Sequence, residues 1–227
     1  LIKEGAEAFT IRAYDDLHGS VLEIKKQRKH SISIKINDSR VTASELVRAF
    51  PSFSIDSKTF FYNDNAPEYR RKHIDRGLFV ASPEYAANWF GYFRALKQRN
   101  SALKQGSISQ ARAYDHQLVV HGEKLNILRC SLIRDTESVF SELTKKLLVE
   151  SSRAKIFSAV SVKLFPGFND QEGLQSELSQ TNESDLRRKS TTKGPHKADV
   201  LFDSKGLLIK DIFSRGEQKL LSILWSI

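Results

Sequence analysis

The sequence predicts an α+β fold in which two β-rich stretches flank a long helical segment. Apolar residues alternate with polar ones near the N-terminus and again after residue 159, which is the period of a half-buried strand. No proline interrupts the chain between Pro83 and Pro166, and apolar residues there recur at helical spacing. We therefore expect three parts: a β-rich part over residues 1–66, a helical arm over 67–152, and a part over 153–227 with return strands, a mobile loop and a final helix.

The first part predicts an antiparallel strand meander. Alternation runs through residues 9–13 and 32–36, and Asn37-Asp38 is typical of the turn that follows. Thr42 with Glu45 has the spacing of a capping box and predicts a short helix that Pro51 stops. The apolar strand positions are Phe9, Ile11, Ala13, Ile32, Ile34 and Ile36.

The helical arm begins at a clear start signal. Ser82 is a favourable N-cap and Pro83 a favourable first residue, so a helix is expected from there to Gly106. A second helix is expected from a sevenfold apolar repeat, which Gly122 weakens in its early part. The two helices are expected to pack antiparallel on the β-rich parts. The repeat consists of Leu118, Leu125, Leu132 and Val139.

The last part contains short strands and a polar interval. Residues 160–164 alternate, and the apolar runs 200–202 and 207–209 are separated by a turn at Asp203–Gly206. Residues Asn169 to Lys193 are rich in Ser, Gln, Glu, Asn and Thr, and we expect a mobile loop there.

The composition of the chain bears on the kinds of partner, location and metal site that can be expected. The net charge of +9 favours a polyanion, without separating DNA, RNA and an anionic membrane surface. No apolar run reaches the roughly 18–20 residues that span a bilayer, so a soluble, cytoplasmic protein is expected. The lone Cys130 is expected to be a small buried hydrophobe, and the six histidines lack the spacing of a zinc site, so we expect no metal centre.

The most informative motif is Ser214-Arg215-Gly216-Glu217-Gln218-Lys219, followed directly by an apolar run. Ser214 and Glu217 have capping-box spacing, so one interpretation is an ordinary helix start. Gly216 is costly in a first turn but lets a ligand approach the backbone, and a helix N-terminus attracts anions. The second interpretation is a phosphate site, and the spacing alone leaves both open.

The string SRGEQKLL resembles the signature motif of the RecF family, short relatives of the SMC-type, ABC-class ATPases of DNA repair. Three further stretches agree in order: residues 67–79 (PEYRRKHIDRGLF), 96–104 (LKQRNSALK) and 194–199 (GPHKAD). The resemblance implies part of an ABC/SMC-type ATPase head with a β-rich lobe interrupted by a helical arm. It also implies that Ser214, Arg215, Gly216 and Glu217 complete the ATP site of a partner subunit.

The same resemblance implies a biological setting. Members are ATP-dependent homodimers that bind DNA at gaps in replication, recombinational repair and the SOS response, with ATP and Mg²⁺ as cofactors. Expected partners are DNA and recombination mediators such as RecR and RecO. The competing hypothesis is a non-enzymatic, basic module that binds nucleic acid or a protein, with the motif serving only as a cap.

Several family features are absent from this sequence. No glycine is followed by lysine, so there is no P-loop (Walker A), and no apolar strand ending in an acidic pair (Walker B) follows the motif. We interpret the chain as an internal fragment that is inactive as an ATPase alone. The stretch Phe50 to Tyr62 contains no glutamine to sense Mg²⁺ and phosphate, and Glu217 stands where the family usually has Gln.

Two groups of basic residues are candidate contacts to the DNA backbone. Arg70 and Arg71 open the first group, and Lys97 follows on the expected long helix together with Arg94, Arg99 and Lys104. The second and denser group is Arg187, Arg188, Lys189 and Lys197. Such runs contact phosphates without reading bases, and the competing interpretation is a solvated surface.

Overall fold

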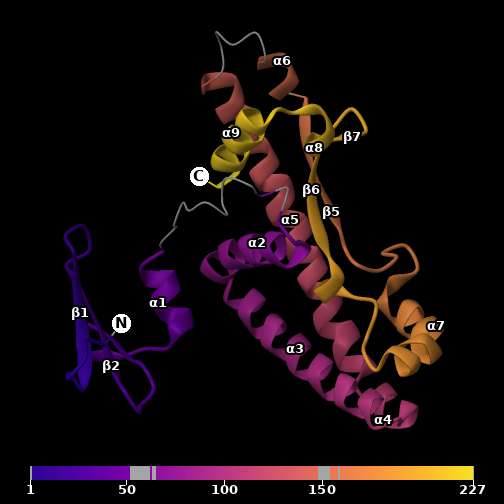
Figure 1. The fold of residues 1–227 in the computed structure, drawn as a ribbon, viewed down its shortest axis with the longest axis horizontal. Coiled ribbons are helices and arrows are strands. Elements are labelled where there is room, and N and C mark those ends of the chain that lie inside the picture. Colours follow the sequence, from indigo (N-terminus) through magenta and orange to yellow (C-terminus); the bar gives the residue numbers. More distant parts are fainter. Residues whose placement is uncertain (1, 52–61, 63–64, 148–153, 158, 227) are drawn as a thin grey trace. The chain divides into compact units, whose positions relative to one another are not determined.

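The structure, a computed structural model, describes residues 2–51, 62, 65–147, 154–157 and 159–226 (Figure 1). It contains antiparallel sheets and helices, which confirms the predicted α+β class. The chain divides into two compact units. The first comprises Leu1–Phe53 with Phe79–Ala81, and the second comprises Ser54–Leu78 with Ser82–Ile227.

The first unit is a four-stranded antiparallel meander in the order β1-β2-β3-β4 with one short helix. The turn at Asn37-Asp38 is confirmed, and both residues adopt the left-handed conformation, with φ of 46° and 65°. The capping box that opens α1 is confirmed, because Thr42 Oγ1 accepts from the Glu45 amide and Glu45 binds the Thr42 amide. The elements are β1 (Ala8–Asp15), β2 (Ser20–Gln27), β3 (Ser33–Ile36), β4 (Ser39–Arg40) and α1 (Ala43–Ala49).

The longest helices of the second unit are α3 and α5, and α3 packs against the N-terminal half of α5 (Figure 1). The start of α3 is as predicted: Ser82 caps it by accepting from the Tyr85 amide, and Pro83 is its first residue. The helices are α2 (Pro67–Ala81), α3 (Pro83–Lys104), α4 (Ile108–Arg112), α5 (Asp115–Leu147) and α6 (Ala154–Phe157).

The sheet of the second unit has the antiparallel order β5-β6-β7. The predicted turn between the last two strands is confirmed, because the Asp203 carboxylate accepts from the Gly206 amide at 3.2 Å. The chain then enters the final helix, which carries the motif. The elements are β5 (Val160–Phe165), α7 (Gly173–Arg188), η2 (Pro195–Lys197), β6 (Asp199–Ser204), β7 (Leu207–Leu208), α8 (Ile209–Ile212) and α9 (Arg215–Ser226).

The expected mobile loop from Asn169 to Lys193 is wrong, because most of it is the helix α7. Its fully buried apolar residues are Leu174 and Leu178, and the partly buried Leu186 packs against Ala102, Leu103 and Ala111. The rest of its buried face is polar and consists of Glu177, Asn182 and Asp185. A composition with few apolar residues misled the prediction because part of the buried face of this helix binds a buried cation, Arg99, through Asp185 and Asn182.

The sevenfold repeat on α5 is only partly the buried seam. Leu118 and Leu125 are fully buried, but Val139 is 56% exposed and its neighbour Phe140 is buried instead. A straight helix has 3.6 residues per turn, so a strict sevenfold repeat drifts around it. Gly122 is a point of close packing rather than of weakness, since an added Cβ would lie 2.7 Å from a methyl group of Leu174.

One hydrophobic core joins the sheet of the second unit to its helices. At its centre the Phe202 ring of β6 meets the Trp225 ring of α9 edge-on, with centroids 5.2 Å apart. The buried members are Tyr62, Ile74, Ile133, Phe140, Phe157, Val160, Val162, Val200, Phe202, Ile209, Phe213, Leu221, Leu224 and Trp225. The last helix is therefore anchored by its own C-terminal half.

A fully buried arginine on α3, Arg99, connects the helices at the other end of this unit. Its guanidinium donates to Asp115 at 2.8 Å and to Asp185 at 2.6 Å. It also donates to Thr191 Oγ1 at 2.8 Å and to Asn182 Oδ1 at 3.2 Å. Burial of a charge is tolerated only when it is paired and hydrogen-bonded, and these four acceptors from α5, α7 and the following segment meet that requirement.

A second buried arginine, Arg129 of α5, ties α2 to the segment before β6. It forms an ion pair with Asp75 and donates to the Pro195 carbonyl at 2.8 Å. The Tyr85 hydroxyl donates to the same Asp75 carboxylate. Two buried arginines thus fix the segment Thr191–Asp199, one at its start and one at its middle.

His196 in this segment is neutral in the folded protein. Its Nε2 lies 3.0 Å from the Thr191 carbonyl, which can only accept, so Nε2 carries the hydrogen. Its Nδ1 then accepts from the Tyr92 hydroxyl at 2.7 Å. Burial lowers the pKa of His196 to about 4, and burial lowers the pKa of His73 on α2 to about 4 as well.

We expect Arg99→Ala to destabilise the second unit by about 3–5 kcal/mol, because it leaves the buried Asp185 and Asp115 carboxylates without their cation. Lys97→Ala is the matched control on the same helix, since Lys97 is exposed, and we expect a change of at most about 0.5 kcal/mol. Urea unfolding followed by circular dichroism measures both. Equal midpoints for the two variants would contradict the role given to Arg99.

We also expect stability to fall as the pH drops from 6.5 to 4. In that window the unfolded chain protonates His73 and His196, whereas the folded protein does not, so each contributes a loss of up to about 3 kcal/mol. Replacing His196 with Asn should make the unfolding free energy less dependent on pH between 7 and 4.5. His116→Asn, at an exposed position, is the control and should leave the dependence unchanged.

Candidate functional site

The motif lies at the exposed start of α9. Ser214 Oγ accepts from the Glu217 amide at 3.4 Å, and Glu217 Oε2 accepts from the Ser214 amide at 2.8 Å. The predicted capping box is therefore confirmed. The Glu217 carboxylate points back into the cap, while Ser214, Arg215 and Gly216 are exposed.

The remainder of α9 holds this turn in a fixed position. Gln218 is buried, and its side-chain amide donates to the Phe213 carbonyl at 2.9 Å. Its backbone amide donates to the Ser214 carbonyl at 2.9 Å. Leu221 and Trp225 lie in the core. An exposed turn on a rigid helix presents its backbone in a defined geometry, as a binding site requires.

The first turn of α9 suits a phosphate group. A Cβ added at Gly216 would meet nothing within 4 Å, so a ligand can approach the backbone there. The Ser214 hydroxyl and the Arg215 guanidinium lie at the same turn, and the positive end of a helix favours an anion. These residues supply hydrogen-bond donors and positive charge of the kind that binds an anion, and the Glu217 carboxylate accepts from the Ser214 amide.

The densest predicted group of cations is on the surface of the second unit. Arg187 and Arg188 form the exposed last turn of α7, and Lys189 follows as its exposed C-cap in the left-handed conformation. Lys197 is exposed in η2. These four side chains are accessible to a polyanion.

Arg70 and Arg71 differ from that group. Arg70 is only 5% exposed and makes a two-point ion pair with Asp199, at 2.7 and 2.8 Å. Arg71 is half-buried and donates to the Ala198 carbonyl at 2.6 Å. Arg70 is thus engaged in holding the start of β6, and its expected DNA contact is corrected to a structural ion pair.

Lys97 is exposed on α3, as are Arg94 and Lys104. Arg99, which was grouped with these basic residues of the helix, differs from them because its side chain is fully buried. Lys97 and Lys104 flank a hollow of about 550 Å³. The hollow is lined by Phe93, Leu96, Lys97, Asn100, Ser101 and Lys104.

Most of the stretch Phe50 to Tyr62, in which the sequence has no glutamine, lies outside the described residues. Cys130 is half-buried, and burial raises its pKa. Among the described residues, no group of three His, Cys, Asp or Glu side chains could hold a metal ion.

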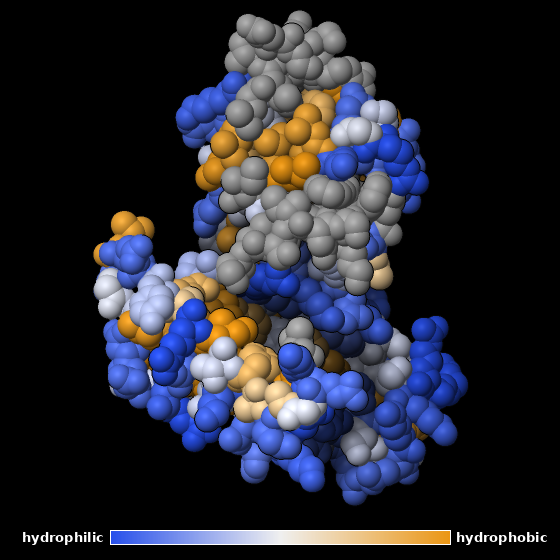
Figure 2. Space-filling view, turned by 60° about the vertical axis from the view of Figure 1, so that its left-hand side comes forward, coloured by the Kyte–Doolittle hydropathy of each residue, from blue (hydrophilic) through white to orange (hydrophobic). Residues whose placement is uncertain are grey.

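The surface that Figure 2 colours by hydropathy is mostly hydrophilic. Apolar side chains form separate patches between the hydrophilic ones. Within the described part of the chain, no helix combines the length and apolar character needed to cross a bilayer.

Comparison with known proteins identifies relatives along most of the chain. No family model matches. The DNA replication and repair protein RecF of Hahella chejuensis is 31% identical over 198 residues, covering 83% of this chain and 51% of that protein. The protein of the same description from Pseudoalteromonas translucida is 30% identical over 228 residues, covering 97% of this chain and 61% of that protein.

Two solved structures share the fold. One is described as the recombination mediator protein RecF-ATPrS in the RecFOR pathway, with a TM-score of 0.85 and 20% identity, covering 100% of this chain and 64% of that chain. The other, RecF-ATP in the same pathway, has a TM-score of 0.81 and 20% identity, covering 100% and 63%. Over most of its length this chain is therefore a homologue of the RecF family of DNA replication and repair proteins, and it spans about half the length of the curated relatives it matches.

Proposed function

We propose that the chain is part of an ATP-dependent DNA-binding protein of DNA replication and recombinational repair. In this proposal the start of α9 completes an ATP site whose other half belongs to a partner subunit. The observation that carries it is the exposed turn of Ser214, Arg215 and Gly216 on a helix whose other end is fixed in the core. A rigid donor surface that faces outward suits a ligand held between two subunits.

ATP with Mg²⁺ would supply the anionic phosphates that join the two halves. This chain's contribution is to bind rather than to cleave: the Ser214 hydroxyl and the first-turn amides donate, and Arg215 adds positive charge. The hydrolytic groups of such ATPases are a P-loop and acidic Mg²⁺ ligands, which this sequence lacks. ATP would then control homodimer formation, and through it the binding of DNA.

The DNA-contacting surface in this proposal consists of accessible cations of the second unit. Arg187, Arg188 and Lys189 form its centre. Lys97, Lys197 and the half-buried Arg71 are further candidates. Contacts of this kind address phosphates and predict binding without sequence preference. Recombination mediators such as RecR and RecO are the proposed protein partners, in gap repair and the SOS response.

One observation favours a second candidate, the non-enzymatic basic module. The two capping bonds between Ser214 and Glu217 account for both residues without any ligand. In that case the motif stabilises α9 and only the cations act in function. The two candidates differ in what happens when Ser214 is replaced.

We expect Ser214→Arg, in a protein that joins this chain to a P-loop segment, to leave ATP binding intact and abolish the ATP-induced dimer. The bulky cation would occupy the space for the partner's nucleotide. Ser214→Ala is the matched control for the cap and should cost about 1 kcal/mol of stability. Sedimentation with and without ATP measures dimerisation, and circular dichroism checks folding. A folded Ser214→Arg protein that still dimerises with ATP would leave the motif as a cap only.

We expect duplex DNA binding by the 227-residue chain to be independent of sequence and steeply salt-dependent. Replacing Arg187, Arg188 and Lys189 with Gln should lower the slope of log K against log salt by about 2.7 if all three contact phosphates. The control replaces the exposed Arg112, Arg134 and Lys145 with Gln, which lowers the net charge equally. Fluorescence anisotropy measures both, and the same slope change in the two triple variants would contradict a localised surface.

A further inference from the structure

The solvent-facing side of the N-terminal sheet forms a second basic surface in the first unit. In an antiparallel sheet, directly opposed residues point to the same face, and so do residues two apart on a strand. The register pairs Arg12 with Glu23, Glu23 with Lys35 and Lys35 with Arg40. This face carries Ala8, Thr10, Arg12, Tyr14, Val21, Glu23, Lys25, Gln27, Ser33, Lys35 and Arg40, and we call it the sheet platform.

Charge on the sheet platform is strongly asymmetric. Four cations, Arg12, Lys25, Lys35 and Arg40, share this face with one acid, Glu23, and a second acid, Asp38, lies at its border. The bond from Arg12 to Glu23, at 2.8 Å, lowers the pKa of that carboxyl, and the positive charges of Arg12, Lys35 and Lys25 lower it further. The same ion pair fixes the Arg12 side chain across the two strands while leaving it 63% exposed.

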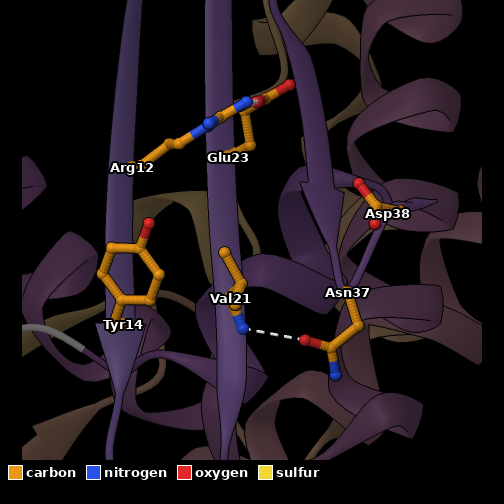
Figure 3. Close-up of a pocket in the computed structure, with 6 residues that line it drawn as sticks. All are labelled: Arg12, Tyr14, Val21, Glu23, Asn37 and Asp38. Atoms are coloured by element: carbon orange, nitrogen blue, oxygen red, sulfur yellow. Dashed lines mark hydrogen bonds and ion pairs between the residues drawn. The ribbon is translucent and has the colours of Figure 1, made fainter.

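An aromatic ring stands beside these charges. Tyr14 is 70% exposed, directly opposite Val21. Figure 3 shows it with Arg12 and Glu23 at a hollow of about 480 Å³, bounded on the far side by Asn37 and Asp38. The Val21 amide donates to Asn37 Oδ1 at 2.8 Å, which fixes this side of the hollow.

We propose that the sheet platform binds single-stranded nucleic acid, with a base stacked on Tyr14 and the phosphates on Arg12, Lys25, Lys35 and Arg40. A duplex buries its bases in its own stack, whereas a single strand can offer a base to an exposed ring. Each of the four strands supplies one cation, and neighbouring strands lie about 4.8 Å apart, so an extended backbone that crosses the strands meets several of them. An anionic membrane or an acidic protein matches the charge but gives the ring no base.

Tyr14 provides the test, because a side chain that is 70% exposed contributes little to the stability of the fold. With the 227-residue chain and a fluorescent oligothymidine, Tyr14→Ala should weaken binding about tenfold at fixed salt. Tyr14→Phe keeps the ring and should bind like the original chain. On an oligomer of the same length without bases, the three proteins should bind equally. Unchanged oligothymidine binding by Tyr14→Ala overturns the proposal.

The cations are tested separately. Replacing Lys25 and Lys35 with Gln should lower the salt slope for the single strand by about 1.4. The matched control replaces Lys3 and Lys29, which are exposed outside the platform, and should change it less. Polyglutamate that competes as well as oligothymidine at equal charge would show a general polyanion surface and overturn the assignment to nucleic acid.

These outcomes are independent of the proposed duplex surface on the second unit. If the Arg187, Arg188 and Lys189 variant loses duplex binding while Tyr14→Ala keeps oligothymidine binding, the proposed function stands and the sheet platform fails. If only the platform variants lose binding, the platform stands and the duplex surface fails.

Discussion

The second unit depends on a guanidinium that is completely removed from water. Arg99 has four acceptors from three different parts of the chain, and without them its burial would be strongly unfavourable. The acceptors of Arg99 are themselves held by further hydrogen bonds. Asp185 also accepts from the amide and hydroxyl of Thr192, and Asn100 accepts from the amide and hydroxyl of Thr191. The charge therefore positions α7 and fixes the start of the segment that leads into β6.

The segment Thr191–Asp199 connects the buried arginines to α9, which begins at the Ser214–Lys219 motif. Arg129 holds the Pro195 carbonyl, Arg71 holds the Ala198 carbonyl, and Arg70 holds the Asp199 carboxylate. β6 then supplies Phe202, against which Trp225 of α9 packs. An unbroken series of contacts thus runs from a buried cation to the helix that displays Ser214. Packing alone would fix α9 less uniquely, because apolar contacts have no direction.

Local signals in the sequence predicted the elements whose causes are local. The caps at Thr42, Ser82 and Ser214 were all confirmed, because a cap is decided by residues three apart. The helix α7 was missed because its stability comes from Arg99, which is more than eighty residues away in sequence. The basic residues were grouped without being sorted by helix face. Arg99 lies three and four residues from Leu96 and Leu103 on the apolar stripe, a position that indicates burial, whereas Lys97 lies off that stripe. The sheet platform could have been found from the polar positions of the alternating pattern, since these share a face as strictly as the apolar ones.

The ion pair between Arg70 and Asp199 joins residues 129 positions apart in the chain. During synthesis α2, α3 and α5 emerge with Asp75 and Asp115, long before the other groups that receive their arginines. These later groups are Asn182, Asp185, Thr191, Asp199 and the carbonyls of Pro195 and Ala198. A hydrated arginine gains nothing from entering an apolar interior, so these helices stay loosely associated until residues 182–199 are available. Closing such long loops is slow, and the unit is expected to acquire its fixed packing in one late step rather than helix by helix. The order of residues along the chain thereby sets when this unit becomes rigid, and the helix that Ser214 caps is made after the residues that hold it.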